Sequence, residues 1–175
     1  AKIAKKLGAS VPFYRSEDAA GDKSTLAEVI IDVMDSYKSI GKEFDYFCCI
    51  FATAPFITPK KLSEAFNKMI NGNYDSVLPL IPYPVPIHQA FKLDSKSDKV
   101  EMFFDDQYGI MTQDMATSYY DAGQFYWMKP NHVKINNRIT GSNSSAIILN
   151  ELEAHDIDNE KDWKIAEKKF SMLVK

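Results

Sequence analysis

Several features that would assign this chain to a protein class are scarce in its sequence. Only two of its 175 residues are cysteine and seven are glycine, while 21 Lys and Arg stand against 24 Asp and Glu. Two cysteines are too few for a disulfide framework, and a net charge of −3 gives no large basic surface for general nucleic-acid binding. No apolar run reaches the roughly 18 residues of a membrane span, and no charged-then-apolar leader opens the chain. These absences predict a soluble, cytoplasmic protein.

The patterns that are present predict one globular domain of mixed structure. A hydrophobic content of 45% supports a single core. Thr25 and Glu28 stand in capping-box spacing before a helical apolar pattern. The continuously apolar segment 46–52 is typical of a strand covered on both faces of a parallel sheet, and a helix over 58–71 and a second strand over 76–81 follow it. This order predicts an α/β fold with a mostly parallel sheet.

The second half of the chain adds an excursion and further strands. Residues 90–93 and 100–104 predict a hairpin around a polar turn, of the kind that often serves dimer contacts. The aromatic segment 119–128 predicts a core or interface strand, and residues 145–150 predict another. In open parallel sheets ligands bind beyond the carboxyl ends of strands, so we expect the loops after the first two predicted strands to line a site.

The chemistry of the chain is concentrated in an acidic turn near its C-terminal end. Asp156 and Asp158 are two residues apart, so in an extended backbone their carboxylates leave the same face, about 7 Å apart. Mg²⁺ takes one or two carboxylates and leaves its other positions to water and phosphates, which suits a nucleotide-handling site. Acidic residues before a helix are also ordinary capping and solvation chemistry, so the turn alone does not decide between the two.

A helix is expected directly after this turn. Asn159 is placed to cap it, and the first turn carries acidic residues that the helix dipole favours. Its predicted buried face consists of Trp163, Ala166, Phe170 and Leu173.

Four stretches, taken together, resemble the nonulosonic-acid cytidylyltransferases, the family that includes CMP-sialic acid synthetases. They follow one another in family order along nearly all of the chain. The stretches are Arg15 with Asp22, Thr53-Ala-Pro-Phe56, Tyr120-Asp-Ala-Gly-Gln-Phe-Tyr-Trp127, and Asp156-Ile-Asp158 with Asp162 and Ala166-Glu167.

The resemblance implies an enzyme that transfers CMP from CTP to the anomeric hydroxyl of a nine-carbon keto sugar acid and releases pyrophosphate. The activated sugar would serve surface glycan or flagellin glycosylation. The implied fold is a Rossmann-like nucleotidyltransferase domain of three layers, the fold of nucleotide-diphospho-sugar transferases, usually homodimeric and dependent on Mg²⁺.

The resemblance also implies roles for individual residues. Asp156 and Asp158 match the family's catalytic metal ligands. The residues matching nucleotide-binding positions are Arg15, Asp22, Ser24, Thr25, Thr53 and Ala54. Those expected to border the sugar are His88, Gln89, Lys92, Gln124 and Tyr126, with Lys92 meeting the sugar's carboxylate.

Two departures from the family pattern refine this interpretation. Sialic acid synthetases tend to read Gln-Pro-Thr-Ser-Pro where this chain has Phe51-Ala-Thr-Ala-Pro55, which favours pseudaminic acid over sialic acid. The family also opens with a glycine-containing basic loop around the triphosphate of CTP, whereas the seven glycines here are scattered. We therefore expect residues 1–175 to form one cytidylyltransferase domain without its N-terminal strand and triphosphate loop, and to be inactive in this form.

Three alternatives stay open at this point. The first is a CMP-N-acetylneuraminate synthetase. The second is a nucleotide-sugar glycosyltransferase with a metal-binding Asp-x-Asp motif, although only 175 − 158 = 17 residues follow the motif here, too few for an acceptor-binding half. The third is a non-catalytic fragment that forms oligomers through the hairpin and the aromatic strand.

Overall fold

A computed structural model describes residues 1–21 and 23–173, and the chain forms two compact units. Unit 1 comprises Ala1–Ile50, Ser63–Val77 and Phe125–Ser145, and unit 2 comprises Phe51–Leu62, Leu78–Gln124 and Ala146–Lys175. Helix α3 and strands β2 and β7 contribute residues to both units. No helix among the described residues is long and apolar enough to cross a membrane.

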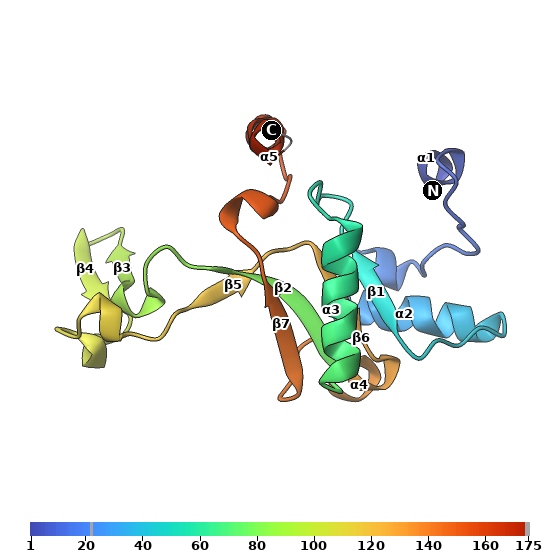
Figure 1. Cartoon of the computed structure of the whole chain (residues 1–175), viewed down its shortest axis with the longest axis horizontal. Helices are drawn as coiled ribbons and strands as arrows, with labels where there is room; N and C mark the ends of the chain where they lie inside the picture. Colours follow the sequence, from blue (N-terminus) through green and yellow to red (C-terminus); the bar gives the residue numbers. More distant parts are fainter. Residues whose placement is uncertain (22, 174–175) are drawn as a thin grey trace. The chain divides into compact units, whose positions relative to one another are not determined.

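The helical segments of unit 1 include one that begins at a capping box. They are α1 (Lys2–Lys6), α2 (Leu26–Ser39) and α4 (Pro130–Asn136), labelled in Figure 1, and the short 3-10 turn η1 (Asp18–Ala20). Thr25 Oγ1 accepts a hydrogen bond from the Glu28 amide, and the Glu28 carboxylate accepts one from the Thr25 amide, so the predicted capping box is confirmed. Lys134 of α4 forms an ion pair with Asp35 of α2.

Strand β6 separates the two strands that sequence reasoning placed side by side. In unit 1, β6 (Phe125–Met128) pairs antiparallel with β1 (Phe47–Ile50) and with the first two residues of β2 (Ser76–Pro82). Because both neighbours run opposite to β6, β1 and β2 share a direction without contacting each other. The prediction of a mostly parallel sheet is therefore wrong, since every strand pair of defined register is antiparallel. The α/β class itself holds.

Helix α3 (Pro59–Asn71) confirms the helix expected after the first strand. Thr58 Oγ1 accepts a hydrogen bond from the Lys61 amide and caps it, as its position before Pro59 predicts. In unit 1, Ala65 and Met69 on α3 are fully buried, and the Phe66 ring packs 4.7 Å from the Trp127 ring of β6. The core of unit 1 lies along this contact.

The strands of unit 2 flank the acidic turn. The later residues of β2 pair antiparallel with β5 (Tyr119–Asp121), and β7 (Ser144–Ile148) also pairs with β2. The segment expected as one aromatic strand over 119–128 is broken at Ala122–Gln124, so that β5 and β6 are separate strands. Gly123 adopts a φ of +61° at this break, a left-handed conformation that other residues rarely take.

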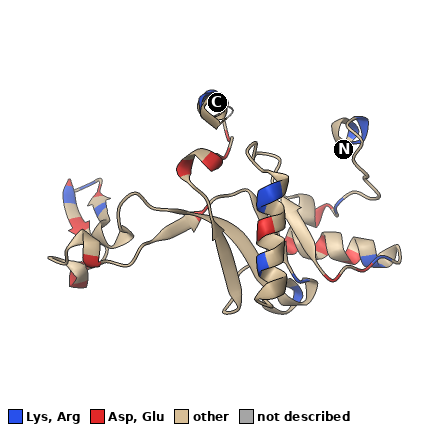
Figure 2. Ribbon diagram, viewed as in Figure 1, with Lys and Arg blue, Asp and Glu red and all other residues tan. Residues whose placement is uncertain are grey.

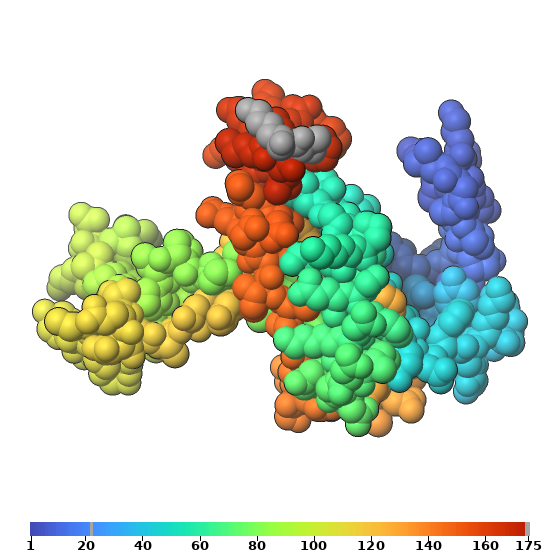
Figure 3. All heavy atoms as spheres, in the orientation of Figure 1, coloured from blue at the N-terminus to red at the C-terminus, as the bar shows by residue number. Residues whose placement is uncertain are grey.

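The predicted hairpin is present in unit 2 as β3 (Phe91–Asp94) and β4 (Lys99–Met102), which pair antiparallel. Three short 3-10 turns, η2 (Ile87–Gln89), η3 (Asp105–Gln107) and η4 (Thr112–Asp114), complete the excursion. Residues 83–118 form its lobe, drawn yellow-green to yellow in Figure 3. Its surface is unusually apolar, with Phe91, Leu93, Val100 and Phe103 each at least 60% exposed.

The chain ends in unit 2 with the turn η5 (Glu151–Glu153) and helix α5 (Glu160–Leu173). The helix forms where expected, but its predicted apolar face is only partly covered. Ala166 is buried, whereas Trp163 and Phe170 are more than half exposed. The apolar periodicity predicted the helix correctly. Of its predicted buried face, Ala166 is the residue that the described part of the chain buries.

Candidate functional site

The acidic turn of unit 2 is fixed by hydrogen bonds before, within and after it. Before it, the Asn150 side chain caps η5 by accepting from the amides of Leu152 and Glu153. Within it, the Ile157 amide donates to the Thr53 carbonyl over 3.2 Å. This bond lies between the two aspartates, so it sets the backbone from which both carboxylates project.

Helix α5 closes the turn from the other side. Asn159 Oδ1 accepts from the amides of Lys161 and Asp162, which confirms Asn159 as the helix cap. In return, the Asp162 carboxylate accepts from the amides of Asp158 and Asn159. His155 Nε2 lies 3.0 Å from the Asp162 carbonyl oxygen, so the histidine beside the aspartates has a structural role.

The loop that contains Thr53 stands against the same turn. Phe51 donates its amide to the Gln124 carbonyl over 3.0 Å, and the Ala54 amide donates to the Phe51 carbonyl. Ala54 and Phe56 are buried, whereas Thr53 is exposed. The structure thus brings together the predicted residues Thr53, Ala54, Asp156 and Asp158.

The break between β5 and β6 forms the third wall of this site. A Cβ atom at Gly123 would lie 3.9 Å from Asp156 Oδ2, so the glycine backbone lies beside that carboxylate. Gln124 follows, only 1% exposed, and its Nε2 donates to the Glu153 carbonyl oxygen over 2.6 Å. The amide of this predicted sugar-bordering residue therefore faces the protein interior.

The two aspartates have the properties of ligands for a hard cation. Both are exposed, and neither carboxylate has a hydrogen bond or an ion pair with any residue that the structure describes. In the same described residues, no group of three or more His, Cys, Asp or Glu side chains is arranged around a common centre. Mg²⁺ does not require such a cage, because one or two carboxylates complete its octahedron with water and substrate phosphates. The residues present therefore fit Mg²⁺ bound together with a nucleotide.

Charges of both signs lie near the turn. Figure 2 shows the two glutamates of η5 in red on the segment that leads to it. Lys61 Nζ lies 3.9 Å from a Glu153 carboxylate oxygen, and Lys169 Nζ donates to the carbonyl oxygens of Glu151 and Ala154.

The other predicted nucleotide-binding residues lie in unit 1, where their polar groups organise the loop before α2. Arg15 Nη1 donates to the Ala19 carbonyl, and Ser24 Oγ donates to the Asp18 carbonyl over 2.6 Å. Thr25 is engaged in the capping box described above. Asp22 lies outside the described residues.

The cavity beside these residues is poorly suited to an anion. It has a volume of about 540 Å³, and Ser24 and Lys23 contribute to its wall. The other charged side chains of its lining are Asp18, Glu28, Asp32 and Asp35. Four carboxylates against one ammonium give this cavity a negative potential, which would repel a triphosphate.

The predicted sugar-binding residues of the excursion have partners of their own. Gln89 Nε2 donates to Thr112 Oγ1 over 3.0 Å, and Lys92 Nζ lies 2.8 Å from a Glu101 carboxylate oxygen across the hairpin. The His88 ring packs against Phe104 in a tilted arrangement, with its Nδ1 buried and without a hydrogen-bond partner among the described residues. Tyr126 lies on β6 in unit 1 and is 7% exposed.

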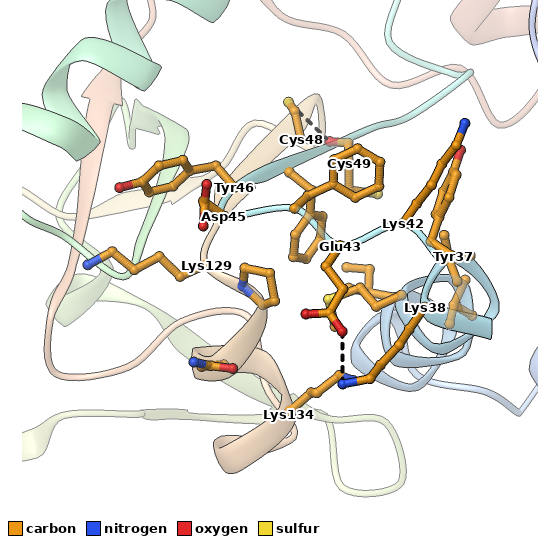
Figure 4. Close-up of a pocket in the computed structure, with 18 residues that line it drawn as sticks. Tyr37, Lys38, Lys42, Glu43, Asp45, Tyr46, Cys48, Cys49, Lys129 and Lys134 are labelled. Atoms are coloured by element: carbon orange, nitrogen blue, oxygen red, sulfur yellow. Dashed lines mark hydrogen bonds and ion pairs between the residues drawn. The ribbon is translucent and has the colours of Figure 1, made fainter. Parts of the chain in front are cut away.

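A cavity of about 850 Å³ lies in unit 1 (Figure 4). Apolar side chains of α2 and residues 44–49 form much of its lining, and Lys38 and Glu43 form an ion pair of 3.0 Å at it. It runs along β1, which lies at the edge of the sheet and pairs with β6. It has no free carboxylate pair like that of the acidic turn.

The adjacent cysteines line this cavity, and both thiols are free. Burial, and secondarily the neighbouring Cys49, raise the pKa of the Cys48 thiol to about 12. A thiol with so high a pKa is a poor nucleophile at neutral pH. The cavity therefore shows no sign of cysteine chemistry.

Comparison with the sequences of known proteins shows which proteins this chain resembles. No protein-family model matches the chain. It is 28% identical to a pseudaminic acid cytidylyltransferase of Campylobacter jejuni over 165 residues, which cover 94% of this chain and 71% of that protein. The chain is therefore similar over most of its length to a protein that is named a pseudaminic acid cytidylyltransferase.

Two further relatives show how broad the resemblance is. A Helicobacter pylori protein named pseudaminic acid cytidylyltransferase and UDP-2,4-diacetamido-2,4,6-trideoxy-beta-L-altropyranose hydrolase is 30% identical over 174 residues, covering 99% of this chain and 33% of that protein. CMP-N,N'-diacetyllegionaminic acid synthase of Legionella pneumophila is 27% identical over 172 residues, covering 96% of this chain and 72% of that protein. The names of these relatives specify different sugars, so the comparison supports the family resemblance without selecting one sugar.

Sequence reasoning found the two aspartates but missed the contacts that hold them. The anchors are the Phe51 amide, the Gln124 side chain and the Glu153 carbonyl, which come from three separate segments. A glutamine beside a glycine carries no local signal for such a role. Only the folded chain brings these groups together.

Proposed function

We propose that this protein transfers CMP from CTP to a nonulosonic acid, with pseudaminic acid as the preferred sugar, and releases pyrophosphate. The observation that carries the proposal is a pair of carboxylates, Asp156 and Asp158, that have no partner among the described residues and project from a turn hydrogen-bonded to the Thr53 loop. The relatives support the reaction, and two of the three compared here carry pseudaminic acid in their names. A Rossmann-like nucleotidyltransferase fold is proposed on the same relationship.

In the proposed reaction, a hydroxyl oxygen of the sugar forms a bond to the α-phosphorus of CTP. The bond from that phosphorus to the bridging oxygen breaks, pyrophosphate leaves with the electron pair, and the proton of the sugar hydroxyl is released to water. Asp156 and Asp158 would hold a Mg²⁺ ion, which supplies charge neutralisation on the phosphates. The Thr53 carbonyl accepts from the Ile157 amide and the Asp162 carboxylate accepts from the Asp158 amide, so the backbone that carries the two aspartates is held before the nucleotide arrives.

In unit 2 we propose Thr53 and Ala54 as nucleotide contacts and His88, Gln89 and Lys92 as sugar contacts. The roles of Arg15, Asp22, Ser24, Thr25, Gln124 and Tyr126 are implied by the resemblance alone. Thr53 is exposed beside the acidic turn, and the Lys92 side chain is more than half exposed despite its ion pair. The capping role of Thr25 and the burial of Gln124 and Tyr126 leave these three the least room for direct contact.

We also propose that the protein forms a homodimer. Several large apolar side chains of the excursion, among them Phe91, Leu93, Val100 and Phe103, are at least 60% exposed, and surfaces of this kind mark contacts between proteins. Light scattering on a size-exclusion column should give twice the chain mass, and Leu93→Lys should lower it to one chain. A wild-type mass of one chain at every concentration would contradict this assembly. Two adjacent cysteines without a disulfide support placing the protein in the reducing cytoplasm.

The test of the reaction is pyrophosphate release by the protein in its full natural reading frame, with CTP and Mg²⁺. Pseudaminic acid and N-acetylneuraminic acid are supplied in parallel. Release with pseudaminic acid alone is the expected result. Release with N-acetylneuraminic acid alone would keep the reaction and replace the substrate, and a dimer that released nothing with either sugar would favour a purely oligomerising role.

A further inference from the structure

Gln124 occupies a central position among the segments that build the acidic turn. Its side chain is 1% exposed, and its Nε2 donates to the Glu153 carbonyl oxygen over 2.6 Å. Its own carbonyl accepts the Phe51 amide over 3.0 Å. One residue thus holds both the segment that enters the turn and the loop that contains Thr53.

The turn is attached to that same loop a second time. The Ile157 amide donates to the Thr53 carbonyl over 3.2 Å, and Thr53 follows Phe51 by two residues. The hydrogen bonds therefore close a ring from Gln124 to Glu153, along the chain to Ile157, across to Thr53, and back through Phe51 to Gln124. Asp156 lies inside this ring, and Asp158 follows it directly.

Removing the Gln124 amide would open the ring at a buried point. The Glu153 carbonyl would lose its short hydrogen bond, and a buried acceptor without a partner is costly enough to make the segment move. The next residue, Ala154, is 3% exposed, so the chain has little free space there in which to find water. The displacement would reach Asp156 two residues later.

We propose that Gln124 is a positioning residue for the metal-binding turn, acting on Asp156 and Asp158 through the Glu153 and Phe51 backbone. This inference rests on the proposed function, since it takes the two aspartates as the metal ligands. It replaces direct contact with the sugar as the role of the Gln124 side chain, because the amide faces the turn. Groups that orient metal ligands in this way commonly change metal affinity by 10- to 100-fold when they are removed.

The test measures the binding of Mn²⁺, used as the probe ion, to the 175-residue chain. The concentration of free Mn²⁺ is read from its electron paramagnetic resonance signal. Gln124→Met keeps the length of the side chain and removes its donor. Gln107→Met is the matched control, because Gln107 Nε2 also donates to a protein oxygen, that of Asp106, but lies in the excursion. Urea denaturation followed by circular dichroism shows how much of each variant is folded.

We expect Gln124→Met to weaken Mn²⁺ binding at least tenfold in the folded protein, with Gln107→Met unchanged. A role confined to global stability would lower the urea midpoint and leave the affinity of the folded protein as it was, which would overturn the inference. Unchanged Mn²⁺ affinity with a raised KM for the sugar in the full-length enzyme would also overturn it and restore direct contact.

Two further outcomes distinguish a failure of the positioning role from a failure of the proposed metal site. If Gln124→Met does not fold, Gln124→Asn keeps an amide but shortens it by one methylene, and the same loss of Mn²⁺ affinity is expected. If the wild-type chain itself binds no Mn²⁺, the metal assignment of the proposed function fails and the inference fails with it. Binding by the wild type together with equal binding by both Gln124 variants would refute the positioning role alone.

Discussion

Neutralising Asp158 should separate folding from metal binding more cleanly than any other change in this protein. In the part of the chain that the structure describes, neither Asp158 nor Asp156 has a side-chain hydrogen bond or an ion pair. Asp158→Asn therefore removes no contact that stabilises the metal-free protein. It removes half of the charge that the proposed site offers to a cation.

The size of both effects can be worked out. Two unit charges about 7 Å apart repel each other by roughly 0.6 kcal/mol in water, and physiological salt screens this further. Without metal, Asp158→Asn should thus change the free energy of unfolding by no more than about 0.5 kcal/mol, towards higher stability. At a Mg²⁺ concentration ten times the dissociation constant, binding should stabilise the wild type by about 1.4 kcal/mol, and the variant by little.

The assay is thermal denaturation of both proteins with and without Mg²⁺. For a chain of this size, about 1.4 kcal/mol raises the midpoint by roughly 3–6 °C in the wild type. Asp114→Asn, which neutralises an exposed carboxylate of the excursion, controls for general charge effects and should keep the full shift. A full Mg²⁺ shift in Asp158→Asn, or a loss of about 2 kcal/mol in its metal-free form, would refute the reasoning.

Three other predictions concern packing, capping and thiol chemistry. Met69→Ala empties a site that is fully buried, so urea denaturation should show a loss of about 2–5 kcal/mol, and a loss below about 1 kcal/mol would contradict the core assignment. The Thr25 amide and then its hydroxyl lower the pKa of the Glu28 carboxyl, so the capping box stabilises the fold above the unfolded pKa of Glu28 and loses this effect as the pH falls through the lower folded value. The stability difference between wild type and Thr25→Ala should accordingly shrink from pH 7 to pH 3, and an equal difference at both would argue against an ionised cap. Because the pKa of Cys48 is raised to about 12, iodoacetamide at pH 8 should react with it on the order of 10³ times more slowly in the folded protein than in urea, and equal rates would show that the thiol is not buried.

The elements with local causes were predictable from the sequence. Thr25, Thr58 and Asn159 each accept a hydrogen bond from an amide within three residues, and the three helices they begin start where expected. A polar turn between residues 90–93 and 100–104 also indicated the hairpin of the excursion. Such features depend on neighbours along the chain, so a sequence pattern contains them.

The arrangement of the sheet was not predictable in the same way. The apolar run of β1 indicates burial on both faces, which a parallel and an antiparallel neighbour provide equally well. Its actual partner, β6, begins 75 residues after β1 ends, as the numbers of Ile50 and Phe125 show. The bond from Gln124 to Glu153 is non-local too, which is why a residue expected to face the sugar proves to be an internal link of the acidic turn.

The most direct test of the central claim is to observe the product. The protein in its full natural reading frame is incubated with CTP, Mg²⁺ and pseudaminic acid, and the reaction is followed by ³¹P nuclear magnetic resonance. The account predicts that the three CTP signals fall while one phosphodiester signal of a CMP-sugar and the signal of pyrophosphate grow in equal amounts, and that Asp158→Asn abolishes both. Conversion of CTP to free CMP without a sugar phosphodiester, or unchanged turnover in Asp158→Asn, would contradict it.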